Sequence, residues 1–425
     1  MRKEEQRCAL REEALALYRC GVEAASPGPA VAKALSERRV DVSPPGLCHV
    51  VAIGKAAGGM MRAALDSLPK RIIGECLVVT NYENATSLAG VTVRLAGHPV
   101  PDKAGLDAAR EVERLADSLG SEDILLFLVS GGGSALLPAP VGGLTLDDKI
   151  RVNELLLASG GDIRAMNLVR QSLSRLKGGG LLRCAAPARV ISLILSDVIG
   201  DDLSIVASGP TVARIGTRDE AVKTLRELEI WDTLPAATRC VLLSGGADIP
   251  SLPSDAHLIG SNAQSLRAMR DAAGADSRIV HGLLNGPVAD AARRIIEARI
   301  YDPDTPVLLF GGETTVKIRG TGQGGRNQEL ALRFALEAER VGITAPWVFL
   351  SGGTDGRDGP TTAAGACVDH LTLERIRRAG GDVGELLANS DSFRALELSE
   401  DLIPQWQTGT NVADVQVLLR PQPAG

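Results

Sequence analysis

Short apolar runs alternate with amphipathic helical stretches along most of the chain. The runs "HVVAIG" at 49–54, "ILLFLV" at 124–129 and "ARVISLILS" at 188–196 are apolar almost throughout, as expected for strands that are buried on both faces. Between them lie helical stretches such as 102–119, in which apolar residues recur every three or four positions. This alternation predicts a parallel sheet covered by helices on both faces, which is an α/β fold.

A second α/β pattern begins after residue 306. It includes a predicted helix over 326–340 and a strand-like run, "WVFLSGG", at 347–353. A chain of 425 residues also exceeds what one hydrophobic core usually organises. We therefore expect two α/β domains, at 1–245 and 306–425, joined by a connecting helical and linker region at 246–305 that starts in a cluster of Gly, Pro, Ser and Asp.

Composition and charge limit the classes of partner that this protein is expected to bind. The net charge of −6 argues against nucleic acid, which requires clustered positive charge. The seven cysteines are scattered without C-x-x-C spacing, which indicates neither a disulfide framework nor a zinc site. The longest apolar runs are too short to span a bilayer. We expect a cytoplasmic protein that binds small molecules but neither nucleic acid nor membranes, with homodimer formation left open.

Four glycine-rich loops follow predicted strands: "IGKAAGG" after 49–53, "VSGGGSALL" after 124–129, "FGGETT" after 307–310 and "LSGGTDGRDG" after 347–350. Glycine lets backbone amides surround an anion, and a helix N-terminus adds partial positive charge. A single glycine can simply end a strand, but four such loops favour an anion-binding cleft. The candidate anion ligands are Ser130, Gly131, Gly132, Gly133 and Ser134, and the candidate nucleotide ligands are Gly311, Gly312, Gly352, Gly353 and Asp355.

Two cations stand beside such loops. Lys55 follows a glycine at a strand end, where a lysine opposes the helix dipole, so we expect it to bind a charged ligand. Arg326 opens the helix after "GTGQGG", and its planar fork suits phosphate oxygens. Gly320, Gly322 and Gly325 have the spacing G-x-G-x-x-G, but no strand-end acid follows at the required distance, so the match to a dinucleotide fingerprint is weak.

Carboxylates stand at further strand ends. Asp197 follows the strand at 188–196, and Glu313 follows the one at 307–310. Magnesium usually takes one or two carboxylates and leaves its other positions to water and phosphate. We take Asp197 and Glu313 as candidate magnesium ligands, although an acid in a turn is more often a cap. His98, in "GHPVPD", is either a base or a histidine of a proline-bounded turn.

The motifs "AIGKAAGGM", "VSGGGSALLPAP", "NLVRQSLSRLKGGG", "LILSDVIGDDLSIVASGPTV" and "GGETTVKIRGTGQGGRNQELAL" occur in the order seen in class II glycerate kinases, or glycerate 2-kinases. The chain resembles that family over about residues 10–415. The resemblance implies two Rossmann-like α/β domains, the second of the MOFRL type, with the active site in the cleft between them. It also implies phosphorylation of D-glycerate to 2-phosphoglycerate, with ATP and Mg²⁺. In that family the catalytic residues match Lys55 and Arg326, and we assign Arg170, Lys177 and Asn327 to substrate or phosphate.

The chain departs from this family at several positions. Ala165 stands where a glutamate is usual, Ser172 replaces a histidine and Gly180 replaces an arginine. These departures leave the exact acid open, including another small sugar acid. Two further functions compete: a hydroxypyruvate reductase, which would need NAD(P)H and a proper fingerprint, and a binding protein without turnover. Retention of Lys55 and Arg326 argues against the latter.

Overall fold

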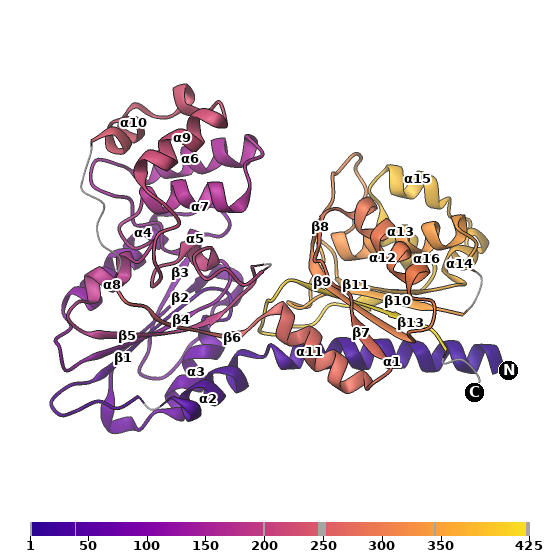
Figure 1. Ribbon diagram of the computed structural model, residues 1–425, viewed down its shortest axis with the longest axis horizontal. Coiled ribbons are helices and arrows are strands. Elements are labelled where there is room, and N and C mark those ends of the chain that lie inside the picture. Colours follow the sequence, from indigo (N-terminus) through magenta and orange to yellow (C-terminus); the bar gives the residue numbers. More distant parts are fainter. Residues whose placement is uncertain (1, 39, 199, 245–251, 344–345, 422–425) are drawn as a thin grey trace. The chain divides into compact units, whose positions relative to one another are not determined.

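The computed structural model describes residues 2–38, 40–198, 200–244, 252–343 and 346–421. They form two compact units: residues 27–259, here called the continuous unit, and residues 1–26 with 260–425, here called the split unit (Figure 1). The expected boundary between residues 245 and 246 lies outside the described residues. The region 246–305, expected to connect two domains, contributes regular helices and strands to the split unit from residue 260 onward.

The continuous unit contains a six-stranded sheet in the order β3-β2-β1-β4-β5-β6. The pairs β1–β2, β2–β3, β1–β4 and β4–β5 are all parallel. The predicted parallel α/β pattern is therefore confirmed here, and β4 is buried along its whole length, as its apolar run predicts. The strands are β1 (Cys48–Ile53), β2 (Ile73–Asn81), β3 (Thr92–Ala96), β4 (Ile124–Val129), β5 (Arg189–Leu195) and β6 (Asp255–Gly260).

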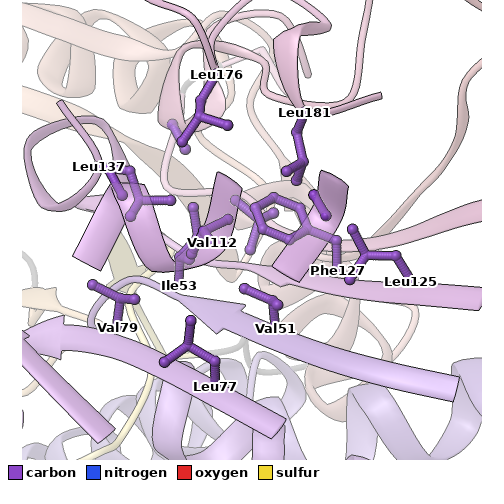
Figure 2. Close-up of a cluster of buried hydrophobic side chains, with 14 of the residues drawn as sticks. Val51, Ile53, Leu77, Val79, Val112, Leu125, Phe127, Leu137, Leu176 and Leu181 are labelled. Carbon is purple, nitrogen blue, oxygen red and sulfur yellow. The ribbon is translucent and has the colours of Figure 1, made fainter. Parts of the chain in front are cut away.

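Helices cover this sheet and build a further helical layer. Figure 2 shows the core on one face, where Ile53 and Phe127 of the sheet lie among Val112, Leu137 and Leu181. The helices α6, α7, α9 and α10 share a separate core. The helices are α2 (Pro27–Glu37), α3 (Ala57–Ser67), α4 (Lys103–Asp117), α5 (Gly133–Leu136), α6 (Leu146–Ala158), α7 (Ile163–Ser172), α8 (Gly180–Ala185), α9 (Arg218–Glu227) and α10 (Ala236–Leu243).

The split unit contains a mixed sheet in the order β12-β11-β10-β13-β9-β7, with β8 also pairing with β9. β10 is antiparallel to β11 and β13, and β13 is antiparallel to β9, whereas β7 and β8 are parallel to β9. The α/β class is confirmed, but this sheet is not the parallel sheet of a Rossmann fold. Its strands are β7 (Ser277–Ile279), β8 (Leu284–Pro287), β9 (Val307–Thr315), β10 (Val348–Gly353), β11 (Ala363–Asp369), β12 (Leu402–Pro404) and β13 (Asp414–Leu419).

The missing helix between β10 and β11 explains the antiparallel pairing. The connection at 354–362 is too short for a crossover, so the chain turns back beside β10. β11 has the small-residue sequence "AAGACVD", which the sequence pattern does not separate from the preceding glycine-rich loop. The helices are α1 (Arg2–Ala24), α11 (Asn262–Ala273), α12 (Val288–Tyr301), α13 (Arg326–Arg340), α14 (Thr372–Arg378), α15 (Val383–Ala388) and α16 (Ser392–Leu398).

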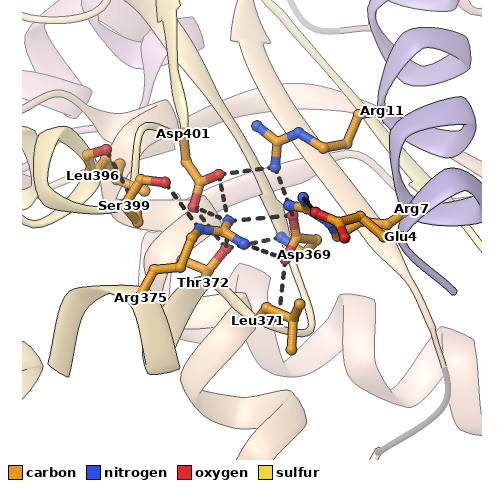
Figure 3. A network of polar contacts seen from close by, with 10 residues as sticks. All are labelled: Glu4, Arg7, Arg11, Asp369, Leu371, Thr372, Arg375, Leu396, Ser399 and Asp401. Atoms are coloured by element: carbon orange, nitrogen blue, oxygen red, sulfur yellow. Dashed lines mark hydrogen bonds and ion pairs between the residues drawn. The ribbon is translucent and has the colours of Figure 1, made fainter. Parts of the chain in front are cut away.

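The N-terminal helix α1 is held in the split unit by a charged network (Figure 3). Nη1 of Arg11 donates to Asp369 and to Asp401, both at 2.8 Å. Arg375 of α14 donates to the same two carboxylates. Burial by itself would raise the pKa of Asp369, but the arginines outweigh it and lower the pKa to about 2. The network therefore ties residues from the two ends of the sequence into one unit.

No described helix combines the length and the apolar character that crossing a membrane requires.

Candidate active site

The strand order of the continuous unit creates a switch point between β1 and β4. From β1 the chain continues to β2 on one side, and from β4 it continues to β5 on the other. Ligands of open α/β sheets bind at such points, beyond the carboxyl ends of the strands. The backbone N–H of Lys55 donates to the carbonyl of Gly131 at 2.9 Å, and the Ser130 hydroxyl donates to the carbonyl of Ile53 at 3.1 Å. The first two glycine-rich loops are thus bound to each other at the switch point.

Three chemically active side chains surround the loop 131–133, each from a different strand end. A Cβ atom at Gly131 would lie 2.0 Å from Oδ2 of Asp197, so a side chain at this position would collide with the carboxylate. A Cβ atom at Gly132 would lie 3.1 Å from the His98 ring and 3.5 Å from Cγ of Lys55, and Gly132 has φ +86°. The parallel sheet thereby brings Lys55, His98 and Asp197 to the same loop.

The charge state of this cluster suits proton transfer next to an anion. Burial and the nearby Lys55 ammonium lower the pKa of His98, so its imidazole is neutral near pH 7 and able to accept a proton. No carboxylate lies within ion-pair distance of Lys55 among the residues that the structure describes. The ammonium group of Lys55 is therefore available to an anionic ligand.

A cavity of about 300 Å³ opens beside the same loop. Three cations meet in it: Lys149 of α6, Arg170 of α7 and Lys177, which follows α7. Nζ of Lys177 donates to the Ser134 carbonyl at 2.6 Å and lies 3.1 Å from its hydroxyl. None of the described lining residues is acidic; they are His98, Pro99, Val100, Pro101, Gly132, Ser134, Ala135, Pro138, Lys149, Val152, Asn153, Leu156, Leu157, Arg170, Leu173 and Lys177.

Burial and mutual repulsion perturb these basic groups, and none of the described residues that line the cavity is a carboxylate that could compensate them. Burial, followed by the charges of Arg170 and Arg175, lowers the pKa of Lys149 to about 7. Burial, followed by Lys149 and Arg170, lowers the pKa of Lys177 well below its ordinary value. Nζ of Lys149 has the Leu173 carbonyl as an acceptor at 3.3 Å. An anion bound here would relieve the repulsion and restore the charges, so the cavity has the electrostatics of an anion site.

The structure brings some of the predicted ligands together and assigns others to packing. Gly132, Ser134, Arg170 and Lys177 line the cavity, whereas Ser130 holds the two loops together and Gly131 and Gly133 make room for close packing. Sequence reasoning missed Lys149, because a lysine within a helix such as α6 looks like any solvated lysine.

Ala165, Ser172 and Gly180, at which the sequence departs from the family pattern, do not line this cavity. The backbone N–H of Ala165 is capped by Asp162, and the buried Ser172 hydroxyl donates to the Leu168 carbonyl at 2.9 Å. A Cβ atom at Gly180 would lie 1.8 Å from the Arg175 carbonyl oxygen, so this backbone requires glycine.

A second charged centre surrounds Arg326 in the split unit. Its Nε and Nη2 donate to the two oxygens of the buried Asp414, at 2.6 and 3.0 Å, and Nη1 lies 2.8 Å from Oε1 of Glu313. Burial by itself would lower the pKa of Arg326, but the carboxylates outweigh it and raise the pKa. The two hydrogen bonds and the ion pair engage three of the five N–H groups of the guanidinium, and the other two take no part in these contacts. Glu313, a candidate metal ligand, is engaged by this arginine.

The G-x-G-x-x-G stretch before Arg326 is packed against the protein itself. The N–H groups of Thr321 and Gln323 donate to side chains of Asn389 and Asp391, at 3.1 Å each. The carboxylate of Asp358 accepts from the first N–H groups of α13, and a Cβ atom at Gly325 would lie 2.2 Å from it. The helix N-terminus that would bind a dinucleotide pyrophosphate is therefore occupied by a carboxylate of this chain.

The remaining predicted residues of the split unit have mixed surroundings. Asn327 is buried, and its amide bonds with Asp358 and Ser351, which indicates packing more than ligand binding. Gly352 packs against the Tyr18 ring, and the Tyr18 hydroxyl donates to the carbonyl of Gly353 at 2.5 Å. The carboxylate of Asp355 accepts a hydrogen bond from the backbone N–H of Arg357. Gly312 lies against the backbone of Leu284. Gly311 lines a separate cavity.

The candidate metal ligands lie in different units, Asp197 in the continuous unit and Glu313 in the split unit. Among the described residues no three acidic, histidine or cysteine side chains gather as a metal-binding group. Because magnesium on a nucleotide needs only one or two protein carboxylates, Asp197 beside the glycine loop still has suitable chemistry for it.

Comparison with known proteins identifies relatives over nearly the full chain. Residues 13–243 match a family described as "Domain of unknown function (DUF4147)", and residues 306–414 match the "MOFRL family". A D-glycerate 2-kinase from Thermotoga maritima is 36% identical over 420 residues, which cover 96% of this chain and 97% of the relative. A glycerate kinase from Homo sapiens is 35% identical over 491 residues, with 97% and 94% covered.

Two further similarities bear on fold and reaction. The crystal structure of glycerate kinase from Thermotoga maritima matches with a TM-score of 0.86 at 34% identity, over 97% of this chain and 100% of that one. A putative hydroxypyruvate reductase from Agrobacterium vitis is 38% identical over 392 residues, with 88% of this chain and 99% of the relative covered.

Proposed function

The chain belongs to the class II glycerate kinases, and from this membership we propose that it transfers the γ-phosphoryl group of ATP to the 2-hydroxyl of D-glycerate. One observation carries the proposal: Lys149, Arg170 and Lys177 meet in a cavity beside the glycine loop at the switch point, and none of the described residues that line this cavity is a carboxylate. A small organic acid that reacts with a polyphosphate needs such a concentration of positive charge.

The side chains in and beside the cavity have separate roles in the proposed reaction. The three cations bind the carboxylate of the acid and thereby orient its hydroxyl toward the glycine loop. His98, whose pKa is lowered by burial and by Lys55, accepts the proton of that hydroxyl. Lys55 has no carboxylate partner among the described residues, and it stabilises the charge on the phosphoryl group during transfer.

In this proposal Arg326 remains a catalytic candidate with a narrower role. Asp414 and Glu313 fix its guanidinium, so it does not present a free fork to the phosphoryl group. Its two remaining N–H groups have a fixed direction, and a fixed donor loses little entropy when it binds an oxygen.

Magnesium, bound with the nucleotide, would screen the polyphosphate charge. Asp197 is the protein carboxylate that we propose for it, because its Oδ2 reaches the glycine loop at Gly131. Asp197→Asn is expected to raise the Mg²⁺ concentration needed for half-maximal rate. A titration that superimposes on the wild-type curve would remove Asp197 from this role.

Hydride transfer is the competing function, and it is favoured by the similarity to the putative hydroxypyruvate reductase from Agrobacterium vitis. The packing of the G-x-G-x-x-G stretch against Asn389, Asp391 and Asp358 speaks against it, because the loop amides have protein partners. The test measures ADP release and NADH oxidation separately, with glycerate and with hydroxypyruvate. NADH oxidation without ADP release would refute the kinase, and the absence of both would favour a binding protein.

Because positions 165, 172 and 180 depart from the family pattern, the same assay should compare several small hydroxy acids as substrates. D-glycerate should be the best of several small hydroxy acids, because none of the three positions lines the cation cavity. NMR of the product identifies the phosphorylated carbon. A 3-phosphorylated product would leave the kinase class intact and refute the regiochemistry.

A further inference from the structure

The cavity that contains Lys149, Arg170 and Lys177 is larger and more apolar than glycerate requires. Its volume of about 300 Å³ reaches the range of about 300–1,000 Å³ that is typical of sites for drug-sized ligands. More than half of its described lining residues are Pro, Ala, Val or Leu. Glycerate is a three-carbon acid with two hydroxyl groups, so it has almost no apolar surface of its own. These walls therefore indicate a ligand that carries an apolar part in addition to its carboxylate.

One face of α6 gives the cavity a charged end and an apolar end. The lining residues of this helix are Lys149, Val152, Asn153, Leu156 and Leu157, which recur every three or four positions, as one helical face requires. A helix rises about 1.5 Å per residue, so Leu157 lies about 12 Å along the axis from Lys149. The carbon chain of glycerate spans only about 3 Å, because each carbon–carbon bond measures about 1.5 Å. Glycerate held at the charged end therefore leaves the apolar end unfilled.

The apolar end is accessible to a ligand. Leu157 of α6 and Val100, in the loop before α4, line the cavity and are 60% and 58% exposed. A single exposed apolar residue is ordinary, but these two border the same cavity. An apolar group that covers them removes their surface from water, which stabilises the complex. Val100 also follows His98 by two residues, so the apolar wall begins next to the proposed proton acceptor.

Hydrogen bonds hold two of the cations in fixed positions relative to this wall. Nε of Arg170 donates to Oδ1 of Asn153 at 3.0 Å, and Nζ of Lys177 donates to the Ser134 carbonyl at 2.6 Å. Arg170 is thereby attached to α6 one helical turn before Leu157, which corresponds to about 5.4 Å along the axis. A chain of four carbon–carbon bonds of about 1.5 Å each has a comparable length. An acid whose carboxylate pairs with Arg170 can therefore reach Leu157 if it carries a branched side chain of four carbons.

We propose that the apolar end is a side-chain subsite, and that the cavity binds 2-hydroxy acids with a branched apolar chain, which compete with D-glycerate. The carboxylate of such an acid pairs with the cations, its hydroxyl faces His98, and its chain covers Leu157 and Val100. A longer sugar acid would place hydroxyl groups against these two side chains, which offer them no hydrogen-bond partner. The inference rests on the proposed function, because the same cations bind the carboxylate. It concerns affinity, and D-glycerate remains the acid that we expect to react fastest.

The first test compares ligands on the unmodified full chain by calorimetry. D-lactate and D-2-hydroxyisocaproate differ only in their side chain, and the second has three more carbon atoms. Each fully buried methylene group favours binding about fourfold, and partial burial in an open cavity reduces the gain, so we expect D-2-hydroxyisocaproate to bind about tenfold more tightly. Equal affinity for the two acids would overturn the proposal.

A third ligand and a variant locate the two ends of the acid. 3-Methylbutan-1-ol has the same hydroxyl and branched chain without the carboxylate, and it should bind at least tenfold more weakly than the acid because the charged hydrogen bonds are lost. Leu157→Gln should reduce the tenfold preference for D-2-hydroxyisocaproate over D-lactate to about threefold or less. The matched control is Leu243→Gln, since Leu243 is 62% exposed on α10 of the same unit and is not among the described lining residues. An alcohol that binds as tightly as the acid, or a full preference in Leu157→Gln that thermal melting shows to be folded, would overturn the proposal.

These outcomes are separate from those of the kinase assay. A wild-type protein that phosphorylates D-glycerate but binds D-lactate and D-2-hydroxyisocaproate equally would overturn the side-chain subsite alone. A wild-type protein that releases no ADP with glycerate, yet prefers D-2-hydroxyisocaproate in a manner that depends on Leu157, would overturn the kinase proposal and support the subsite.

Discussion

Replacing Lys149 by methionine should change stability and substrate binding in opposite directions. In the folded protein, burial and the nearby arginines lower the pKa of Lys149 from 10.5 to about 7. One pKa unit corresponds to about 1.4 kcal/mol, so a charged amine at this position costs up to about 4 kcal/mol at neutral pH. Part of the side chain reaches solvent, and screening reduces the cost to roughly 1–2 kcal/mol. Methionine fills similar space without the charge, so Tm should rise by about 2–4 °C per kcal/mol gained.

The same pKa shift determines how stability depends on pH. Between about pH 7 and pH 10.5 the unfolded chain holds a proton on Lys149 that the folded protein has lost. Because the unfolded state binds more protons in this window, the free energy of unfolding rises with pH. Lys149→Met should remove the part of this rise that Lys149 contributes, while Lys177, whose pKa is also lowered, still contributes a rise of the same sign. Binding of the acid favours the charged amine, so the wild type should take up a proton from the buffer when it binds substrate above pH 7.

The expected loss of binding follows from the contact that is removed. A hydrogen bond to a charged group contributes about 1.5–3 kcal/mol, which corresponds to a roughly 10- to 100-fold increase in the Kd or KM for the acid. Thermal melting measures stability, and steady-state kinetics at varied glycerate measures binding. Calorimetry in two buffers of different ionisation enthalpy measures the proton uptake.

Lys223→Met is the control, since this exposed lysine lies on α9 of the same unit and makes only a surface ion pair with Glu227. It should alter stability by no more than about 0.5 kcal/mol and leave the KM unchanged. A Lys149→Met protein that is less stable than the wild type and binds glycerate equally well would refute the reasoning, because Lys149 would then be a packing residue.

Three further predictions concern the charged groups. Lys55→Met should lower kcat about 10²- to 10³-fold with almost unchanged Tm, and a near-normal kcat in steady-state kinetics would make Lys55 a bystander. Arg326→Lys should lower kcat more than it raises the KM, because an ammonium group cannot bind both oxygens of Asp414 and also Glu313. A change in KM alone would contradict a role of Arg326 in the transition state. Lowering the pH from about 4 to about 2 should destabilise the split unit, because the pKa of Asp369 falls from 3.8 to about 2 on folding, so the unfolded chain takes up the proton first. Circular dichroism during acid titration measures this loss of stability. Arg375→Ala removes a partner of Asp369, so the stability of this variant should depend less on pH. An unchanged pH dependence would contradict the lowered pKa of Asp369.

Local patterns were sufficient for the parts of this protein that depend on sequence neighbours. The predicted helix over 326–340 is confirmed as α13, and the apolar run at 124–129 is confirmed as the buried strand β4. Periodicity identifies such elements because a helix or a strand repeats within a few residues. The order of the glycine-rich motifs was enough to identify the family, which the relatives confirm.

Partners that lie far apart in the sequence could be found only in the folded chain. Lys149 differs from a solvated lysine through its burial and through Arg170 and Arg175, which the fold brings near it. Arg326 looks like a free phosphate ligand until Asp414, 88 residues away, pairs with it. The glycine stretch before Arg326 resembles an open anion site until Asp358 occupies the helix N-terminus. Charge pairing and burial depend on distance in space, which no local repeat encodes, so the electrostatics of the candidate site came from the tertiary structure.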